Sequence, residues 1–451
     1  MPVLDDVASG VVEPVLAVQD GRAGAGRYPG SETTPPDREQ VSTPLDAADT
    51  ADIGQRARTI RRRRGLSLEV AAGLAGICTS YLSRLERGER RFDRGGLLSA
   101  LAEALGCSVI DLTGQPYLPA DRAGADALAT LPGIRVAIYD APLDDPPDVS
   151  ARPVAELVRR ANAADAARDQ NRYALAGAEL GTLLTELQVI AATGRPDDRR
   201  TALAALVQAA HVAAAVAEAM GHQDLALAAA AREHEAAARL GDPTLLGLAR
   251  YGWAQTWAKV GARRRATSVV AESLADLDVL ADPLADYTGP AEMAGMAHLI
   301  SAKLAARAHR ADDAASHLDH AAELAERTGE RNTAYQHFGP TNVALWRVGV
   351  GADLGGGGAV YERAMRDAPD LDVLDSATRS GNYHFDLARA LVSDEGDRDA
   401  EALRHLDTAD RYAPQLIRHN PIARDLLGGL EQRARRRVWE LDSLRNRFGV
   451  G

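Results

Sequence analysis

Apolar residues recur at helical spacing along most of the chain after residue 50. Ile53, Ala57 and Ile60 stand at i, i+4 and i+7, the spacing of one buried face of an α-helix. From residue 151 to about residue 448 the helical pattern continues, broken only by short polar, glycine or proline turns. The pattern therefore predicts an all-α protein.

Within the long helical region a unit repeats. Five alanines, 40 to 48 residues apart, each follow a short polar or glycine turn and open a helix: Ala226, Ala266, Ala314, Ala359 and Ala402. Each unit reads as a helix, a turn and a second helix. Because one helix pair cannot bury its apolar face alone, neighbouring pairs are expected to stack into an α-superhelix.

Residues 51–115 have a different pattern, that of a small module of short helices. Ser67 is a suitable N-cap for a helix that ends near Gly76, and a third helix runs from about Cys78 to Arg87. On that third helix Leu82 and Leu85 face inward, so the small polar and arginine side chains face outward. Two short helices joined by a glycine turn are the layout of a helix-turn-helix domain, with two more helices following.

Two stretches of this module, residues 53–67 and 81–90, resemble the XRE family of phage-repressor-like DNA-binding domains. The resemblance covers about 60 residues and implies five helices. It implies an ion pair between Arg61 and Glu86, and contacts to base edges from Thr79, Ser80, Ser83 and Arg84. It also implies contacts to DNA phosphates from Ser67, Arg87, Arg90 and Arg91.

The charge distribution agrees with DNA binding by this module alone. The whole chain has 52 basic and 64 acidic residues and a formal charge of -12, whereas residues 51–115 carry 11 arginines and 7 acids. Neutralising phosphates supplies much of DNA affinity, so the acidic remainder should keep away from the duplex. Since one small module makes a small interface, we expect a homodimer on a double-stranded operator, paired through the repeat domain.

The domain boundaries follow from composition. We expect a disordered, proline- and glycine-rich tail at 1–50, the helix-turn-helix domain at 51–115, a Pro/Asp-rich linker at 116–150 and the repeat domain at 151–451. The repeats resemble tetratricopeptide (TPR) repeats. With the stretches 338–346, 383–389 and 413–424, they also resemble the sensory half of actinobacterial regulators that join an XRE head to such a tail.

A ligand groove is expected on the inner face of the superhelix, where polar and aromatic residues gather. Concave repeat surfaces bind peptides through such side chains, so a peptide, a small molecule or a protein partner is expected as the effector. The same residues could instead form hydrogen bonds between neighbouring repeats. The candidate set is Asn332, Tyr335, His337, Asn342, Arg379, Asn382, Tyr383, His384 and Asp386.

Other chemistry is not expected. His309, Asp313, His317 and His320 do not share one helix face, so we expect no metal site and no cofactor. Cys78 is expected to be a cap or packing residue rather than a redox trigger, and Gly355 to Gly358 form a connection rather than a phosphate loop. No run of 18 apolar residues or secretion signal is found, so we expect a cytoplasmic, non-enzymatic regulator that avoids membranes. The alternative is a repeat scaffold for protein assembly, anchored by the helix-turn-helix module.

Overall fold

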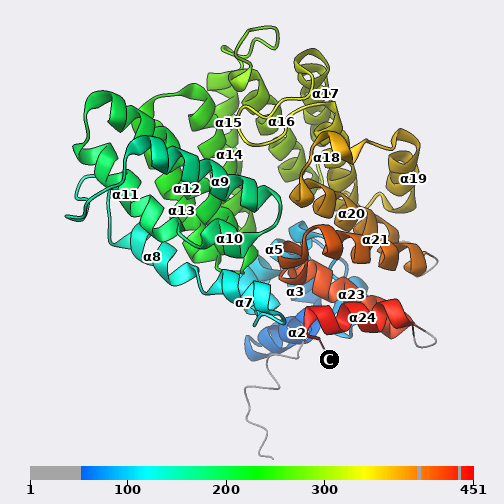
Figure 1. Cartoon of the computed structure of the whole chain (residues 1–451). Helices are drawn as coiled ribbons and strands as arrows, with labels where there is room; N and C mark the ends of the chain where they lie inside the picture. The colour runs from blue at the N-terminus through cyan, green and yellow to red at the C-terminus, as the bar shows by residue number, and fades with distance from the viewer. Residues whose placement is uncertain (1–51, 394–397, 435–437, 451) are drawn as a thin grey trace, which may run out of the picture. The chain divides into compact units, whose positions relative to one another are not determined.

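The helical period of the sequence is realised in a computed structural model, which describes residues 52–393, 398–434 and 438–450 (Figure 1). Over these ranges the fold is all-α, and β-structure is limited to one isolated bridge between Arg331 and Phe338. The tail expected at 1–50 lies outside the described residues.

The head consists of five short helices around a core of its own. Leu82, Leu101, Leu105 and Leu112 are fully buried in that core. At Gly54, a methyl group would come within 2.0 Å of the carbonyl oxygen of Leu85. Only glycine therefore lets the first of these helices lie so close to the third, which contains Leu85. The helices are α2 (Ile53–Arg63), α3 (Leu68–Leu74), α4 (Thr79–Glu86), α5 (Gly95–Leu105) and α6 (Val109–Thr113).

The segment 116–150, expected to be a linker, is instead part of the folded body. It contains α7 (Arg122–Leu128) and α8 (Leu131–Tyr139). The apolar piece inside it explains the difference, because Leu131, Ile134 and Ile138 are buried in the same core as the repeat helices. Most of its prolines and aspartates lie in the turns before and after these helices, whereas Asp126 lies within α7 and Pro132 in the first turn of α8.

The remaining helices form the repeat domain. They are α9 (Val154–Asp169), α10 (Tyr173–Gly177), α11 (Leu180–Thr193), α12 (Pro196–Ala219), α13 (Gln223–Leu240), α14 (Pro243–Lys259), α15 (Arg263–Leu277), α16 (Gly289–Arg307), α17 (Ala311–Thr328), α18 (Pro340–Asp353), α19 (Gly357–Asp367), the 3-10 helix η1 (Leu371–Val373), α20 (Ala377–Val392), α21 (Asp399–Tyr412), α22 (Pro414–Arg418), α23 (Pro421–Arg433) and α24 (Trp439–Phe448).

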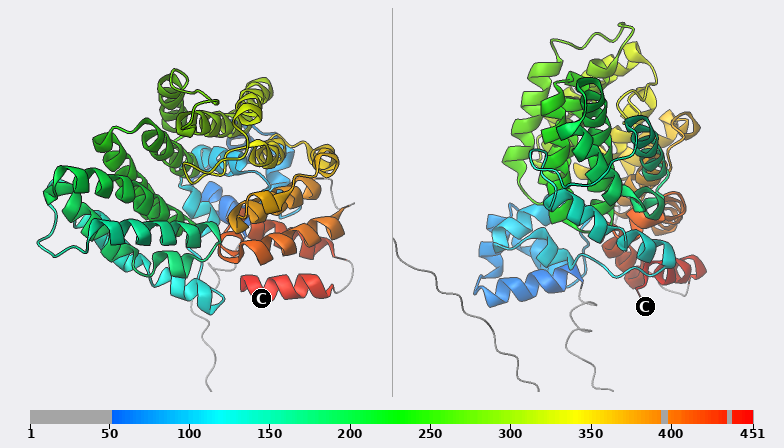
Figure 2. Two further views of the ribbon diagram at one scale, coloured as in Figure 1. Left: turned by 45° about the horizontal axis from the view of Figure 1, so that its top comes forward. Right: turned by 60° about the vertical axis from the view of Figure 1, so that its left-hand side comes forward.

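From α12 to α21 these helices pack as successive pairs: α12 on α13, α14 on α15, α16 on α17, α18 on α19 and α20 on α21. The pairs follow one another in an arc (Figure 2). Four of the five repeated alanines, Ala226, Ala266, Ala314 and Ala402, are fully buried at the fourth residue of the second helix of a pair. A small side chain at this point lets the two helices of a pair approach closely. The fifth, Ala359, is exposed near the start of α19.

Two segments are long and apolar enough to cross a membrane by length and composition alone. They are residues 173–193 and α12, and 50% and 72% of their most apolar windows are buried inside the protein. Core helices pass the same test, so this is weak evidence for a membrane span.

The head is tied to the repeat domain by contacts of its loop 88–94 and of α5. The described residues of the head and of the repeats belong to one compact unit, and α5 packs on α16. The loop reaches α20 and α23, as the hydrogen bonds below describe. The repeats therefore hold the head in one orientation.

Candidate DNA interface and ligand cavity

The turn between α3 and α4 sets the geometry of the DNA-binding element. The Ser67 hydroxyl caps α3 by accepting a hydrogen bond from the Val70 amide at 3.1 Å. Gly76 in the turn has a φ of +69°, a left-handed conformation that other residues adopt at a cost. Cys78 then occupies the N-cap position of α4. Leu82 and Leu85 anchor α4 in the head core, which leaves its opposite face outward.

The residues predicted to contact bases lie on that outward face. Thr79 and Ser80 are exposed, and Ser83 and Arg84 are half-buried. The Cys78 thiol lies 3.3 Å from the Ser80 hydroxyl, and this contact lowers the pKa of Cys78. The face therefore presents hydroxyls and a guanidinium, groups that can contact base edges in the major groove.

Three of the four predicted phosphate-contacting residues are accessible. Ser67 and Arg87 are exposed, and Arg90 is half-buried. Arg87 pairs with Glu89 at 2.5 Å on the surface, where both side chains are about half exposed. Such a surface pair contributes little stability, so the two side chains can separate and Arg87 can contact a phosphate instead.

Arg91 departs from the expected role. Its side chain is buried, 3.3 Å from a carboxylate oxygen of Asp425 and 3.2 Å from Asp52. The same carboxylate of Asp425 accepts a hydrogen bond from the Phe92 amide at 2.6 Å. Burial raises the pKa of Asp425 to about 6, although Arg91 and that amide favour the carboxylate. Arg91 thus holds the head against α23 and does not lie on the face of Thr79 and Ser80.

Arg61 and Glu86 form the ion pair that the family resemblance implies. The two carboxylate oxygens of Glu86 accept from Nε and Nη2 of Arg61 at 2.5 and 2.7 Å. Arg61 also donates to the carbonyl of Leu66 at 2.9 Å. Only 12% of the Arg61 side chain and 5% of the Glu86 side chain are exposed. The pair joins α2 to the end of α4.

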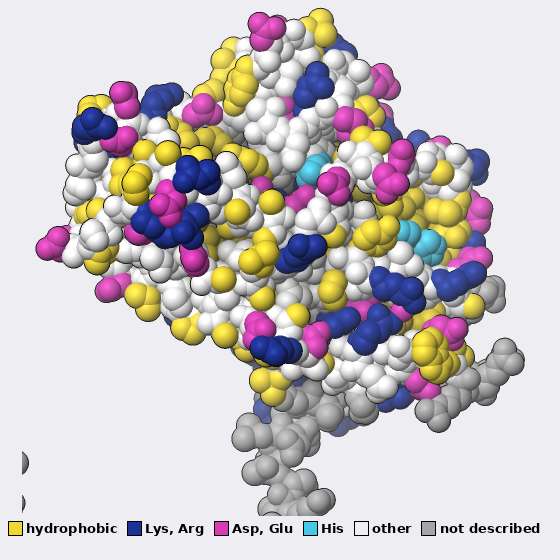
Figure 3. All heavy atoms as spheres, viewed as in Figure 1, with side chains coloured by type: hydrophobic (Ala, Val, Ile, Leu, Met, Phe, Trp, Pro, Cys, Tyr) yellow, Lys and Arg dark blue, Asp and Glu magenta, His cyan; other side chains and the backbone are white. Residues whose placement is uncertain are grey.

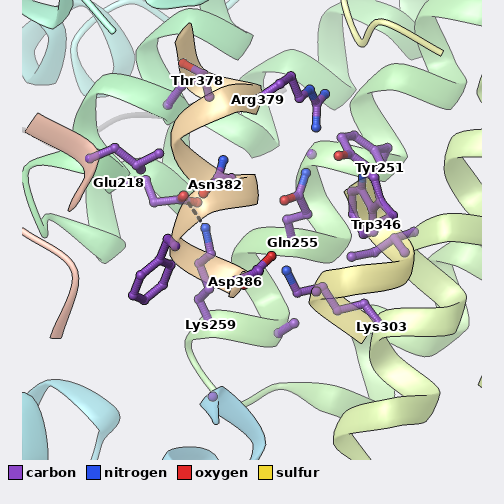
Figure 4. Close-up of a pocket in the computed structure, with 18 of the residues that line it drawn as sticks. Glu218, Tyr251, Gln255, Lys259, Lys303, Trp346, Thr378, Arg379, Asn382 and Asp386 are labelled. Carbon is purple, nitrogen blue, oxygen red and sulfur yellow. Dashed lines mark hydrogen bonds and ion pairs between the residues drawn. The ribbon is translucent and has the colours of Figure 1, made fainter. Parts of the chain in front are cut away.

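A cavity of about 290 Å³ lies between α12, α14, α16, α18 and α20, next to the head at Gly95 (Figure 4). Five of the nine residues of the expected ligand groove line it: Asn342, Arg379, Asn382, Tyr383 and Asp386.

The other four residues of the set are engaged elsewhere. His337 contacts Asp169 at 2.9 Å, and its amide bonds to Asn332. His384 stacks on His405, and Tyr335 sits at a positive φ in the loop before α18.

Several residues of the cavity wall were not predicted from the sequence. Three of these residues come from α14, one from α16 and one from α18. They are Tyr251, Gln255, Lys259, Lys303 and Trp346. One signal was available in the sequence, because Lys259 and Lys303 are its only lysines.

The histidines of α16 and α17 form a cluster different from the one considered above. His298 lies 3.0 Å from His317 and stacks on His320, whereas His309 sits in the turn at a positive φ. In the described part of the chain, no group of three His, Cys, Asp or Glu residues is arranged to hold a metal ion. Histidine side chains reach the face shown in Figure 3 at two places.

Residues 52–112 match a protein family described as a helix-turn-helix domain. No curated protein and no solved structure matches the chain. The match runs from the start of α2 to Leu112 in α6, and it supports a helix-turn-helix DNA-binding module in this part of the chain. Such a module suggests a DNA-binding regulator.

Proposed function

We propose that the protein is a sequence-specific transcriptional regulator in which an XRE-type head reads an operator and a TPR-like repeat domain senses an effector in its cavity. The observation that carries the proposal is the outward face of α4. Thr79 and Ser80 are exposed there and Arg84 is half-buried, on a helix fixed by buried leucines. A rigid helix with polar side chains on its free face suits the major groove.

Contacts between the cavity wall and the head support effector sensing. Arg389, which lines the cavity, donates from Nε to the carbonyl of Asp93 at 2.8 Å. The guanidinium of Arg307, also on the wall, packs so closely on Gly95 that a methyl group there would lie 3.3 Å from its Nη2. A ligand that displaces either arginine would move the head directly. Binding in the cavity and binding to DNA would then be coupled.

The remaining parts of the proposal concern assembly and location. A single head offers few base contacts, and paired heads on a two-fold operator would double them; we therefore propose a homodimer. We also propose that the protein acts in the cytoplasm and carries no enzymatic activity.

The test is selection of binding sites from random double-stranded DNA with the full chain. The wild type should return a consensus sequence, and Arg84→Ala should lose preference at one base pair, worth about 1–3 kcal/mol of discrimination. Arg327→Ala, which removes an exposed arginine at the end of α17, is the control and should return the wild-type consensus. If no consensus emerges from the wild type, the repeat-scaffold alternative replaces the proposal.

A further inference from the structure

Lysine is nearly absent from this chain, and both lysines lie on one cavity. Of 52 basic residues only Lys259 and Lys303 are lysines, whereas arginines are spread along the whole sequence. Lys259 comes from the last turn of α14 and Lys303 from α16, 44 positions later, and both line the cavity next to the head. Both lysine side chains of the protein therefore lie on this cavity, and the other basic residues of the chain are arginines.

The two lysines differ in their partners. Lys259 is paired with Glu218 of α12 (Figure 4). The ammonium of Lys303 lies 5.3 Å from the centre of the Trp346 ring. In the described part of the chain, no carboxylate lies within 4 Å of it. Lys303 therefore brings an unpaired positive charge into the cavity.

The arginines on the same wall are already engaged. Arg307 pairs with Asp353 at 3.3 Å, and Arg389 pairs with Asp386 at 2.6 Å and with Asp353. Arg379 donates to the backbone and side-chain oxygens of Gln336, both at 3.0 Å. Lys303 is the cation of this group that has no anionic or carbonyl partner, so the wall has room for one more negative charge.

The charge of Lys303 persists at neutral pH. Burial, followed by the charge of Arg307, lowers the pKa of Lys303 to about 8, although Asp386 and Asp353 act in the opposite direction. The ammonium form therefore still predominates at pH 7. A partly desolvated ammonium gains more from a carboxylate than an exposed one does, because water screens the pair less.

We propose that this cavity binds a small organic monocarboxylate, with the ammonium of Lys303 as the anchor of its carboxylate. The body of the ligand would lie against Trp346 and Tyr251, whose ring centres are 6.5 Å apart. Polar groups of the ligand would meet the amides of Gln255 and Asn382, which face the same space (Figure 4).

The number of free charges decides between a carboxylate and a phosphate. A phosphate dianion is held by several convergent donors, commonly arginines in bidentate geometry or backbone amides. Here Arg307 and Arg389 are paired with Asp353 and Asp386, and Arg379 donates to oxygens of Gln336, so Lys303 is the member of this group whose charge has no hydrogen-bonding partner. One charge beside an aromatic wall suits a monoanion with a planar or apolar body.

The identification of this ligand as the effector rests on the function proposed above. The binding of the ligand to the cavity does not depend on that function. The test is therefore made without DNA. Reductive methylation of the full chain with ¹³C-formaldehyde labels the two lysines and the N-terminal amine, which give separate NMR signals. Lys259→Arg and Lys303→Arg variants assign them. The probes are benzoate, its uncharged analogue benzamide, and inorganic phosphate.

We expect benzoate to shift the Lys303 signal saturably and to leave the N-terminal amine unchanged, with benzamide at least tenfold weaker. Equal shifts by benzoate and benzamide, a response without saturation, no response, or tighter binding of phosphate would each overturn the proposal.

A second measurement does not depend on labelling. Benzoate should raise the melting temperature of the wild type and of Lys259→Met, and should fail to raise that of Lys303→Met. Stabilisation of all three proteins alike would place the anion elsewhere and overturn the proposal. Loss of benzoate binding with intact operator selection would refute this inference alone, and the reverse result would refute the proposed DNA function alone.

Discussion

At the scale of single residues, burial separates arginines that hold the fold from arginines that are free for DNA. Arg61, Arg91 and Arg389 are buried or nearly so and are paired with carboxylates. Arg87 is exposed, and its partner Glu89 is equally exposed. Removing one partner of a buried pair leaves the other charge without solvent or counter-ion, whereas an exposed charge is simply hydrated.

Glu86→Ala tests this difference. We expect it to destabilise the head by about 3–5 kcal/mol, because Arg61 would remain buried without a partner. Glu89→Ala is the matched control on the exposed pair and should cost at most about 1 kcal/mol. Calorimetry of the full chain, together with trypsin cleavage at the arginines of α2, would report on opening of the head. Equal effects of the two changes would show that the Arg61–Glu86 pair contributes no more than a surface pair.

At the scale of elements, two helix pairs carry the same kind of histidine contact. His298 of α16 faces His317 of α17 at 3.0 Å, and His384 of α20 faces His405 of α21 at 3.0 Å. In each contact one ring donates and the other accepts, so the accepting ring must be neutral, and two protonated rings could not form the contact. Burial, followed by the neighbouring histidines, lowers the pKa of His298 to about 4 and that of His384 to about 4.

These contacts predict a loss of stability in mild acid. The folded-state pKa values lie below the unfolded value of 6.5, so the unfolded chain binds more protons between pH 6.5 and 4. The stabilising contribution is complete above pH 6.5 and is lost as the pH falls toward 4. We expect the melting temperature to fall between pH 7 and pH 5 by about 2–4 °C more in the wild type than in the double variant His298→Asn/His384→Asn.

His309→Asn is the control for this experiment, because His309 is exposed in the turn before α17. It should behave as the wild type does at both pH values. Identical pH dependence in the wild type and the double variant would mean that the histidine pairs do not govern acid stability.

At the scale of the molecule, head and repeats are joined by a buried polar contact rather than by a free linker. Arg91 and the Phe92 amide bind Asp425 of α23, and Arg389 of α20 binds the carbonyl of Asp93. Both connections involve the loop that follows α4. The orientation of the recognition helix is therefore set by the repeat domain.

The salt dependence of DNA binding can distinguish an arginine that holds the head on the repeats, such as Arg91, from an arginine that contacts a DNA phosphate, such as Arg87. Arg87→Ala should make the plot of log K against log salt shallower by about 0.9, since one phosphate fewer is neutralised. Arg91→Ala should leave that slope unchanged, while hydrogen exchange in α23 accelerates because Asp425 loses its partner. A slope reduced equally by Arg91→Ala would return Arg91 to the DNA interface.

The sequence by itself determined the local structure. The apolar period, the Ser67 cap, the turn glycines and the repeated alanines specify helices and their pairing because they act over a few residues. The outward face of α4 followed from Leu82 and Leu85 alone. Residues 116–150 were harder to interpret, because their prolines and aspartates suggested a linker while Leu131 and Ile134 were buried by helices distant in the sequence.

Only the tertiary structure decided which distant residues meet. Asp425 lies 334 positions from Arg91, and no periodicity relates the two, so an arginine beside the recognition helix could be interpreted as a phosphate contact. Likewise, Lys259 and Lys303 stand on separate helices, and only the packing of α14 against α16 brings them to one cavity. Burial depends on the packing of the whole chain. It determines whether a charged side chain pairs within the protein and stabilises the fold, or stays available to bind DNA or a ligand.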